Sequence, residues 1–259
     1  MTDITNLYYQ NPELDGSSKL LLNSNKIGVL LIHGFTATTV EVQKLFEYFK
    51  AQGFSVSAPL LPGHGTTPGE LNKIKYQDWI IAVENAFHKL SGHCENILVG
   101  GESMGAVMAM LLAQKHKDVS GLMLFSPALL VDRLRYAKWI KPFVKYLDKN
   151  QPEDDLPWQG YTVYPTAATA EFYKLTRRVK KDLARISSPT IIFQGKHDRS
   201  INPENAEFIY SRISSQIKEK VYLDHSGHVI LLDQEIKLIM TKLFSFFDSS
   251  ETLRKFRGL

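Results

Sequence analysis

The sequence predicts an α/β fold with a mostly parallel central sheet, and two observations predict it. Six short apolar or β-branched runs alternate along the chain with stretches of helical periodicity, the order that a parallel sheet with crossover helices requires. The run at residues 27–32 is apolar at almost every position, as in a strand buried on both faces. The six predicted strands are residues 27–32, 55–58, 96–99, 121–125, 190–193 and 220–223.

Two helical stretches have apolar residues every three or four positions, the pattern of a helix packed on a sheet. These residues are Trp79, Ile80, Val83, Phe87 and Leu90 in the first stretch and Ile236, Ile239, Met240, Leu243 and Phe247 in the second. Before the first parallel strand, residues 8–9 and 19–22 are predicted to add antiparallel edge strands.

One connection is too long for a simple crossover. Between Ser126 and Pro189 the chain is several times longer than the dozen or so residues that a crossover needs. We therefore expect a core domain of residues 1–126 and 189–259, with a cap or lid insertion of residues 127–188. The insertion should sit above the edge of the sheet at which the parallel strands end. Its apolar first half should both anchor it and line a substrate pocket, for which Val131 and Leu134 are the candidate residues.

The composition of the chain argues against several classes of function. The chain of 259 residues has 31 Lys and Arg against 27 Asp and Glu, and its charges are scattered, so a nucleic-acid partner is not predicted. Neither a signal peptide nor an apolar run long enough to cross a bilayer is evident, so integral membrane association is not expected. A single cysteine, Cys94, is compatible with a reducing cytoplasm, and we expect a cytoplasmic protein. The sequence makes no prediction of an oligomeric state.

The pentapeptide of residues 101–105 carries the strongest chemical signal. Its order is Gly101-Glu102-Ser103-Met104-Gly105, directly after a predicted strand and directly before a predicted helix. Such a sharp turn lifts a serine hydroxyl out of the sheet and aims the next amide at an oxyanion. A Gly-x-Ser-x-Gly can also occur by chance in a loop, but the flanking strand and helix favour a nucleophile. We expect Ser103 as the nucleophile and the Met104 amide as an oxyanion donor.

A serine nucleophile needs a base and an acid, which in this type of fold follow in the order serine, acid, histidine. Asp198 lies in the turn after the strand at 190–193, and two histidines, His225 and His228, lie in the loop after the strand at 220–223. We favour His228 as the base because Gly227 frees the backbone beside it. His225 is the alternative. A metal pair formed by these histidines is discounted because no third ligand cluster accompanies them.

Two further positions bear on the chemistry. The amide of Phe35, in the loop after the strand at 27–32, is placed to be the second oxyanion donor. His33 in the same loop is interpreted as structural. Glu102 is expected to be buried and hydrogen-bonded, and the run of cations at residues 177–181 is interpreted as a solvated helix face.

Taken together, these motifs resemble the α/β-hydrolases, and within them the bacterial carboxylesterases and monoacylglycerol lipases. The resemblance spans nearly the whole chain, with one departure, Ala106, where many relatives have a second glycine. The segments are His33-Gly34-Phe35-Thr36, Leu61-Pro62-Gly63-His64-Gly65, Gly101-Glu102-Ser103-Met104-Gly105, Gly195-Lys196-His197-Asp198 with Ile201-Asn202-Pro203, and Ser226-Gly227-His228-Val229 running into Leu232-Asp233. The resemblance implies Ser103, Asp198 and His228 as the triad, and Phe35 and Met104 as the oxyanion donors.

The sequence thus predicts a serine carboxylic-ester hydrolase that needs neither cofactor nor metal and acts on a small-molecule ester. Short- to medium-chain acyl esters, including monoacylglycerols, are the expected substrates. Acyl transfer to an alcohol and carbon–carbon bond hydrolysis use the same triad and remain alternatives. A non-catalytic ligand-binding protein of this fold is a third, but it predicts a damaged triad, whereas all three members are present here.

Overall fold

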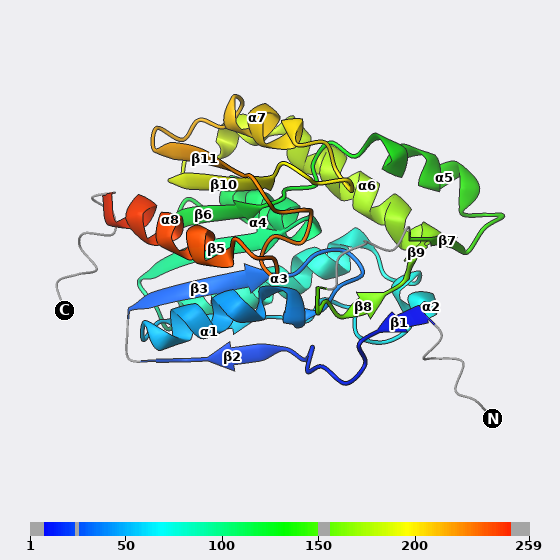
Figure 1. Cartoon of the computed structure of the whole chain (residues 1–259), viewed down its shortest axis with the longest axis horizontal. Coiled ribbons are helices and arrows are strands. Elements are labelled where there is room, and N and C mark those ends of the chain that lie inside the picture. The colour runs from blue at the N-terminus through cyan, green and yellow to red at the C-terminus, as the bar shows by residue number, and fades with distance from the viewer. Residues whose placement is uncertain (1–7, 24–25, 150–155, 250–259) are drawn as a thin grey trace.

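A seven-stranded sheet forms the centre of the protein (Figure 1). The structure is a computed structural model that describes residues 8–23, 26–149 and 156–249. In sheet order the strands are β11 (Lys218–Leu223), β10 (Thr190–Gly195), β6 (Val119–Phe125), β5 (Asn96–Glu102), β3 (Ile27–Ile32), β4 (Ser55–Ala58) and β2 (Lys19–Leu21). All neighbours pair parallel except β2 and β4. The predicted α/β fold is confirmed, and all six predicted parallel strands belong to this sheet.

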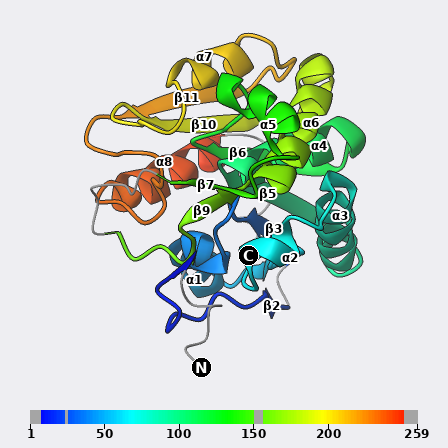
Figure 2. The same ribbon diagram turned by 90° about the vertical axis from the view of Figure 1, so that its right-hand side faces the viewer.

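Helices cover both faces of the sheet (Figures 1 and 2). Figure 1 looks onto the face that carries α1 (Gln43–Ala51) and α8 (Ile236–Ser249), which pack on one apolar cluster. On the other face α3 (Tyr76–Ser91), α4 (Met104–Lys115) and α6 (Thr166–Lys181) share a second cluster. Outside residues 127–188, the structure also has η2 (Thr39–Val42), α2 (Pro68–Leu71) and α7 (Glu204–Tyr210). No helix in the described ranges is long and apolar enough to cross a membrane.

The two predicted edge strands have different partners. Strand β2 pairs with β4 at the edge of the central sheet, as expected. Strand β1 (Tyr9–Gln10) instead pairs with β8 (Gly160–Tyr161), so its predicted place at the sheet edge is wrong. Because the Tyr9 ring packs against that of Tyr161, with centroids 5.6 Å apart, this N-terminal segment lies on the connection between β6 and β10.

That connection, residues 127–188, is called the inserted segment below. It contains η3 (Asp132–Tyr136), α5 (Ala137–Ile140), β7 (Tyr146–Asp148), β8, β9 (Val163–Pro165), α6 and η4 (Leu183–Arg185), with β7 paired antiparallel to β9. Figure 2 shows α5, α6, β7 and β9 together at one end of the sheet. Helix α6 is followed directly by η4 at the end of the segment.

The apolar first half of the inserted segment is only partly buried. Leu129 is 3% exposed, whereas Trp139 and Phe143 are 69% and 87% exposed. The expectation that this whole run anchors the segment or lines a pocket is therefore wrong for Trp139 and Phe143. Trp139 lies on the short helix α5, in which only Ala137 is buried, and Phe143 lies in the turn that follows this helix.

Candidate active site

Ser103 lies on the turn between β5 and α4, where the backbone is strained. Its φ is 55°, in the left-handed region that non-glycine residues rarely adopt at a cost of about 1–3 kcal/mol. A Cβ atom at Gly105 would lie 2.0 Å from the carbonyl oxygen of Ile32, and one at Gly101 would lie 2.3 Å from the Gly105 carbonyl carbon. The two glycines are thus the residues that allow helix, strand and turn to approach so closely.

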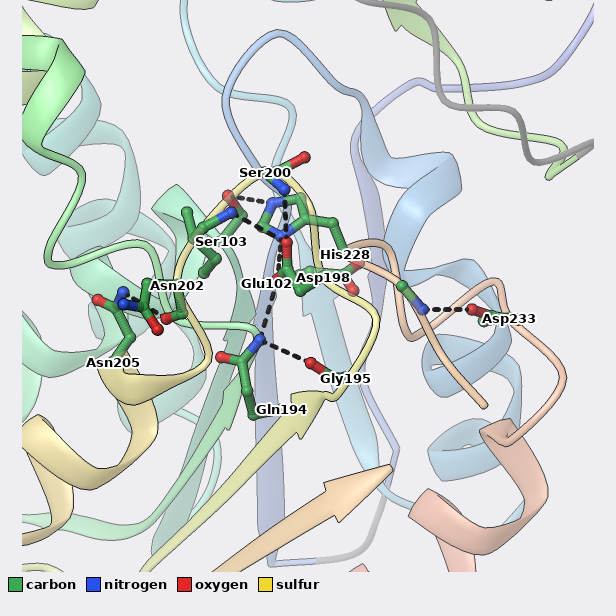
Figure 3. A network of polar contacts seen from close by, with 12 residues as sticks. Glu102, Ser103, Gln194, Gly195, Asp198, Ser200, Asn202, Asn205, His228 and Asp233 are labelled. Atoms are coloured by element: carbon green, nitrogen blue, oxygen red, sulfur yellow. Dashed lines mark hydrogen bonds and ion pairs between the residues drawn. The ribbon is translucent and has the colours of Figure 1, made fainter. Parts of the chain in front are cut away.

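The structure brings Ser103, His228 and Asp198 into one hydrogen-bonded chain (Figure 3). His228 Nε2 is 3.0 Å from Ser103 Oγ, and His228 Nδ1 is 2.7 Å from Asp198 Oδ2. The three residues come from the ends of different strands: β5, β11 and β10. His225 is exposed on the same loop as His228, and its amide donates to Glu235 (2.9 Å). Only His228 has the geometry of a base for Ser103.

Asp198 is held on both of its oxygens. Oδ1 accepts from the amides of Ser200 (2.8 Å) and Ile201 (3.0 Å), and Oδ2 accepts from Gln194 Nε2 (2.9 Å) as well as from His228. Gln194 lies near the end of β10 and is fully buried. Since each donor fixes one lone pair, the carboxylate has one orientation toward the imidazole.

Charge and burial act in opposite directions on this pair. Burial would raise the pKa of Asp198, but the charge of His228 and the hydrogen bonds from His228, Ile201 and Ser200 hold it below the usual value. Burial also lowers the pKa of His228, yet the charge and hydrogen bond of Asp198 outweigh it and raise that pKa above 6.5. Asp198 therefore stabilises an imidazolium at His228, the species that forms when a serine proton is accepted.

Two carboxylates fix the loop that carries His228. The Gly227 amide donates to Asp233 Oδ2 (3.0 Å, Figure 3), and Ser226 Oγ donates to Glu235 Oε2 (2.6 Å). Both acceptors lie just after the loop and before α8. The chain folds back on itself, so the imidazole is held by local contacts.

One of the two predicted oxyanion donors, Met104, lies within the elbow, and the other, Phe35, lies in the loop after the neighbouring strand β3. In the described residues, neither the Phe35 nor the Met104 amide donates a hydrogen bond. The Phe35 loop is fixed from both sides, because the Gly34 amide donates to Glu41 Oε2 (2.5 Å) and His33 Nε2 accepts from the Leu61 amide (3.1 Å). Since neither amide has an acceptor among the described residues, both are available to bind an oxyanion.

Two buried carboxyl groups lie next to this machinery. Glu41 on η2 contacts the Gly34 amide, and burial raises its pKa to about 7. Glu102 is fully buried, as expected, and accepts from the Leu231 amide (3.2 Å) with Oε1, while Oε2 has no hydrogen-bond partner in the described residues. Burial and the charge of Glu41 raise the pKa of Glu102 well above its usual value.

The inserted segment reaches the oxyanion loop through aromatic rings. The Tyr164 ring stacks nearly parallel to that of Phe35 (4°, centroids 6.4 Å), and the Phe172 ring lies 5.4 Å from it. Val131 and Leu134, the predicted pocket residues, are half-buried and pack against the cluster shared by α3, α4 and α6.

Three residues of the site were not identified from the sequence: Gln194, Glu41 and Asn205. Asn205 Oδ1 accepts from the amides of Leu129 (3.1 Å) and Leu130 (2.6 Å) and so ties the start of the inserted segment to α7. Of these three, only Gln194 could have been found from the sequence, because it lies at the end of a predicted strand and residues at strand ends lie at the catalytic edge of the sheet. Glu41 and Asn205 act through contacts between distant elements.

One group of side chains has donors that could share a metal ion. Within the described ranges, it consists of Glu84 and His88 on α3 and His116 after α4, with ligand atoms within 4.8 Å of one another. Its donors already contact one another, since His116 Nε2 is 2.6 Å from Glu84 Oε2 and Lys115 pairs with the other carboxylate oxygen. His116 lies just after the last residue of α4, whereas Ser103 lies just before the first residue of the same helix. This group is therefore at the opposite end of α4 from Ser103.

The chain matches the family Hydrolase_4, described as "Serine aminopeptidase, S33", over residues 23–165 and 153–235. It is 31% identical over 242 residues to a thermostable monoacylglycerol lipase of a Bacillus species, covering 92% of this chain and 97% of the relative. It is 27% identical over 226 residues to a carboxylesterase of Bacillus subtilis, covering 85% and 92%.

Solved structures have the same fold. A structure described with the metagenome-derived lipolytic enzymes LipS and LipT has a TM-score of 0.85 at 28% identity, covering 90% of this chain and 98% of that chain. A soluble variant of Saccharomyces cerevisiae monoglyceride lipase has a TM-score of 0.73 at 18% identity, covering 95% and 96%, which supports the fold alone. These relatives support a serine hydrolase that cleaves esters. By family match and fold, the chain belongs to the Hydrolase_4 family of α/β-hydrolases.

Proposed function

We propose that this protein is a serine carboxylic-ester hydrolase that forms an acyl-enzyme on Ser103. The observation that carries the proposal is the hydrogen-bonded chain from Ser103 through His228 to Asp198, with distances of 3.0 and 2.7 Å. A serine hydroxyl needs such a base to become a nucleophile at neutral pH. The strained backbone at Ser103, which the two elbow glycines permit, is a second support.

In the proposed reaction, Ser103 Oγ attacks the ester carbonyl while His228 Nε2 accepts its proton. The Phe35 and Met104 amides hold the oxyanion, and Asp198 stabilises the imidazolium. His228 then donates the proton to the leaving alcohol as the carbon–oxygen bond breaks. A water molecule, activated by the same histidine, attacks the acyl-enzyme and releases the acid, which returns Ser103 to its starting state.

The substrates that we propose are short- to medium-chain acyl esters, including monoacylglycerols. Relatives named monoacylglycerol lipase and carboxylesterase support this class. We further propose that residues 127–188 cap the site and that Val131 and Leu134 border the acyl chain. Each buried methylene would contribute about 0.8 kcal/mol. A covered site leaves little room for a triacylglycerol.

The test is a kinetic comparison of wild type with Ser103→Ala on p-nitrophenyl esters and monoacylglycerols of graded chain length. We expect kcat to fall by about 10⁴ in the variant, since only binding and oxyanion contacts remain. Val131→Phe and Leu134→Phe should shorten the preferred acyl chain with little effect on an acetyl ester. Ester turnover that persists in Ser103→Ala would refute the mechanism, and unchanged chain-length profiles would refute the pocket assignment.

A further inference from the structure

Lys149 is a charged residue of the inserted segment that the proposed reaction does not use. It directly follows β7, and its backbone amide donates to the Thr162 carbonyl (3.1 Å). The ammonium lies over two aromatic rings, 5.0 Å from the centroid of Trp158 and 5.2 Å from that of Tyr164. Within the described parts of the chain it makes neither a hydrogen bond nor an ion pair with a carboxylate.

The Tyr164 ring lies between this ammonium and the proposed oxyanion loop. Tyr164, under the ammonium, stacks on Phe35, whose amide is one of the two proposed oxyanion donors. The charge of Lys149 also acts on His228 and on Glu41. The side chain is half-buried, and cation–π contacts hold it in place while leaving its three N–H donors free.

We propose that Lys149 is the anion-binding group of the substrate site, and that the enzyme prefers esters with a carboxylate on the acyl or alcohol part. The inference rests on the proposed ester hydrolysis and names the substrate class that the site selects. An ammonium donates most strongly to a carboxylate, less strongly to a hydroxyl and not at all to an alkyl group. Acidic half-esters should therefore react faster than hydroxylated esters such as monoacylglycerols, and those faster than plain alkyl esters.

Burial and the charge of Glu41 determine when the charge of Lys149 is available. Burial lowers the pKa of Lys149 to about 8 and raises that of Glu41 to about 7. Burial keeps His64 neutral by lowering its pKa well below the usual value. Near pH 6.5 Lys149 is charged and Glu41 is mostly neutral, whereas near pH 9 Glu41 is charged and Lys149 mostly neutral. The preference for an anion should fall as the pH rises across this range.

A different role would be packing alone, with the methylenes of Lys149 covering the two rings. The two roles make different predictions, because packing does not distinguish a charged substrate from a neutral one of the same shape. The probe is therefore a pair of isosteric esters: a monomethyl dicarboxylate and the corresponding amide. Glutarate, adipate and suberate supply three lengths, and butyryl esters of glycolate and glycolamide place the charge on the alcohol side.

The measured quantity is the ratio of kcat/KM for the acid to that for the amide at pH 6.5. The wild type should give a ratio of about ten or more for at least one pair, the effect of one hydrogen bond to a charged group. Lys149→Gln should bring the ratio close to one, and Lys149→Arg should keep it high. Lys145→Gln, which alters an exposed lysine four residues earlier, is the matched control and should leave the ratio unchanged.

A ratio near one in the wild type for every pair, or equal ratios in wild type and Lys149→Gln, would overturn the inference. If Lys149→Gln does not fold, the wild-type ratio between pH 6.5 and 9 decides, since it must fall with pH. The titration of His228 cancels in this ratio because both esters share it. Wild type that hydrolyses none of the esters would instead contradict the proposed function.

Discussion

The elbow around Ser103 and the stretch of the inserted segment around α5 are packed in opposite ways. At the elbow a single added methyl group at Gly105 would overlap a backbone oxygen, at 2.0 Å. In the inserted segment the whole Phe143 side chain is 87% exposed. The elbow thus fixes the position of Ser103, whereas the exposed stretch around α5 can vary without disturbing it, as the proposed role of the inserted segment in substrate selection requires.

The largest effect should separate the two histidines of one loop. His228→Ala is expected to lower kcat on p-nitrophenyl butyrate by about 10⁴, nearly as much as the loss of Ser103, because triad residues act as a unit. His225→Ala is the matched control and should retain activity within about twofold, since its side chain is exposed. An inactive His225→Ala with an active His228→Ala would reverse our choice of base.

A smaller effect should appear in the stability of the two regions. Gly105→Ala adds one carbon where none fits, and we expect it to lower the free energy of unfolding by about 3 kcal/mol. Phe143→Ala removes an entire exposed ring and should change the free energy of unfolding by less than about 0.5 kcal/mol. Urea unfolding of both variants measures the difference. Equal losses would show that the two regions do not differ as described.

The smallest effect is a gradual one, the loss of activity with falling pH. His228 must be neutral to accept the Ser103 proton, and its pKa is raised by Asp198 above 6.5. The value of kcat/KM on a neutral ester should therefore be maximal above this pKa and fall about tenfold per pH unit below it. A pH titration in a constant-ionic-strength buffer gives the midpoint. If kcat/KM instead fell with a midpoint near pH 4, the titrating group would be a carboxylate, which would contradict His228 as the base.

The residues that the sequence predicts are those with a local pattern, and the residues that it misses are those placed by contacts between distant elements. Ser103, Asp198 and His228 each follow a recognisable strand and turn, so local patterns were enough to place them on one edge. Glu41 and Lys149 have no such pattern, because their surroundings are made by residues from other elements: the Gly34 amide for one, and the rings of Trp158 and Tyr164 for the other. Strand β1 was misplaced for the same reason, since its partner β8 lies in the inserted segment.

The central claim is that Ser103 is the one activated nucleophile of this protein, and covalent labelling tests it most directly. Wild type, Ser103→Ala and Lys149→Gln would each be treated with a serine-directed phosphonate, digested and mapped by peptide mass. We expect one adduct per chain, on Ser103, in wild type and in Lys149→Gln, and none in Ser103→Ala. An adduct on another residue, or an unlabelled wild type, would contradict the account.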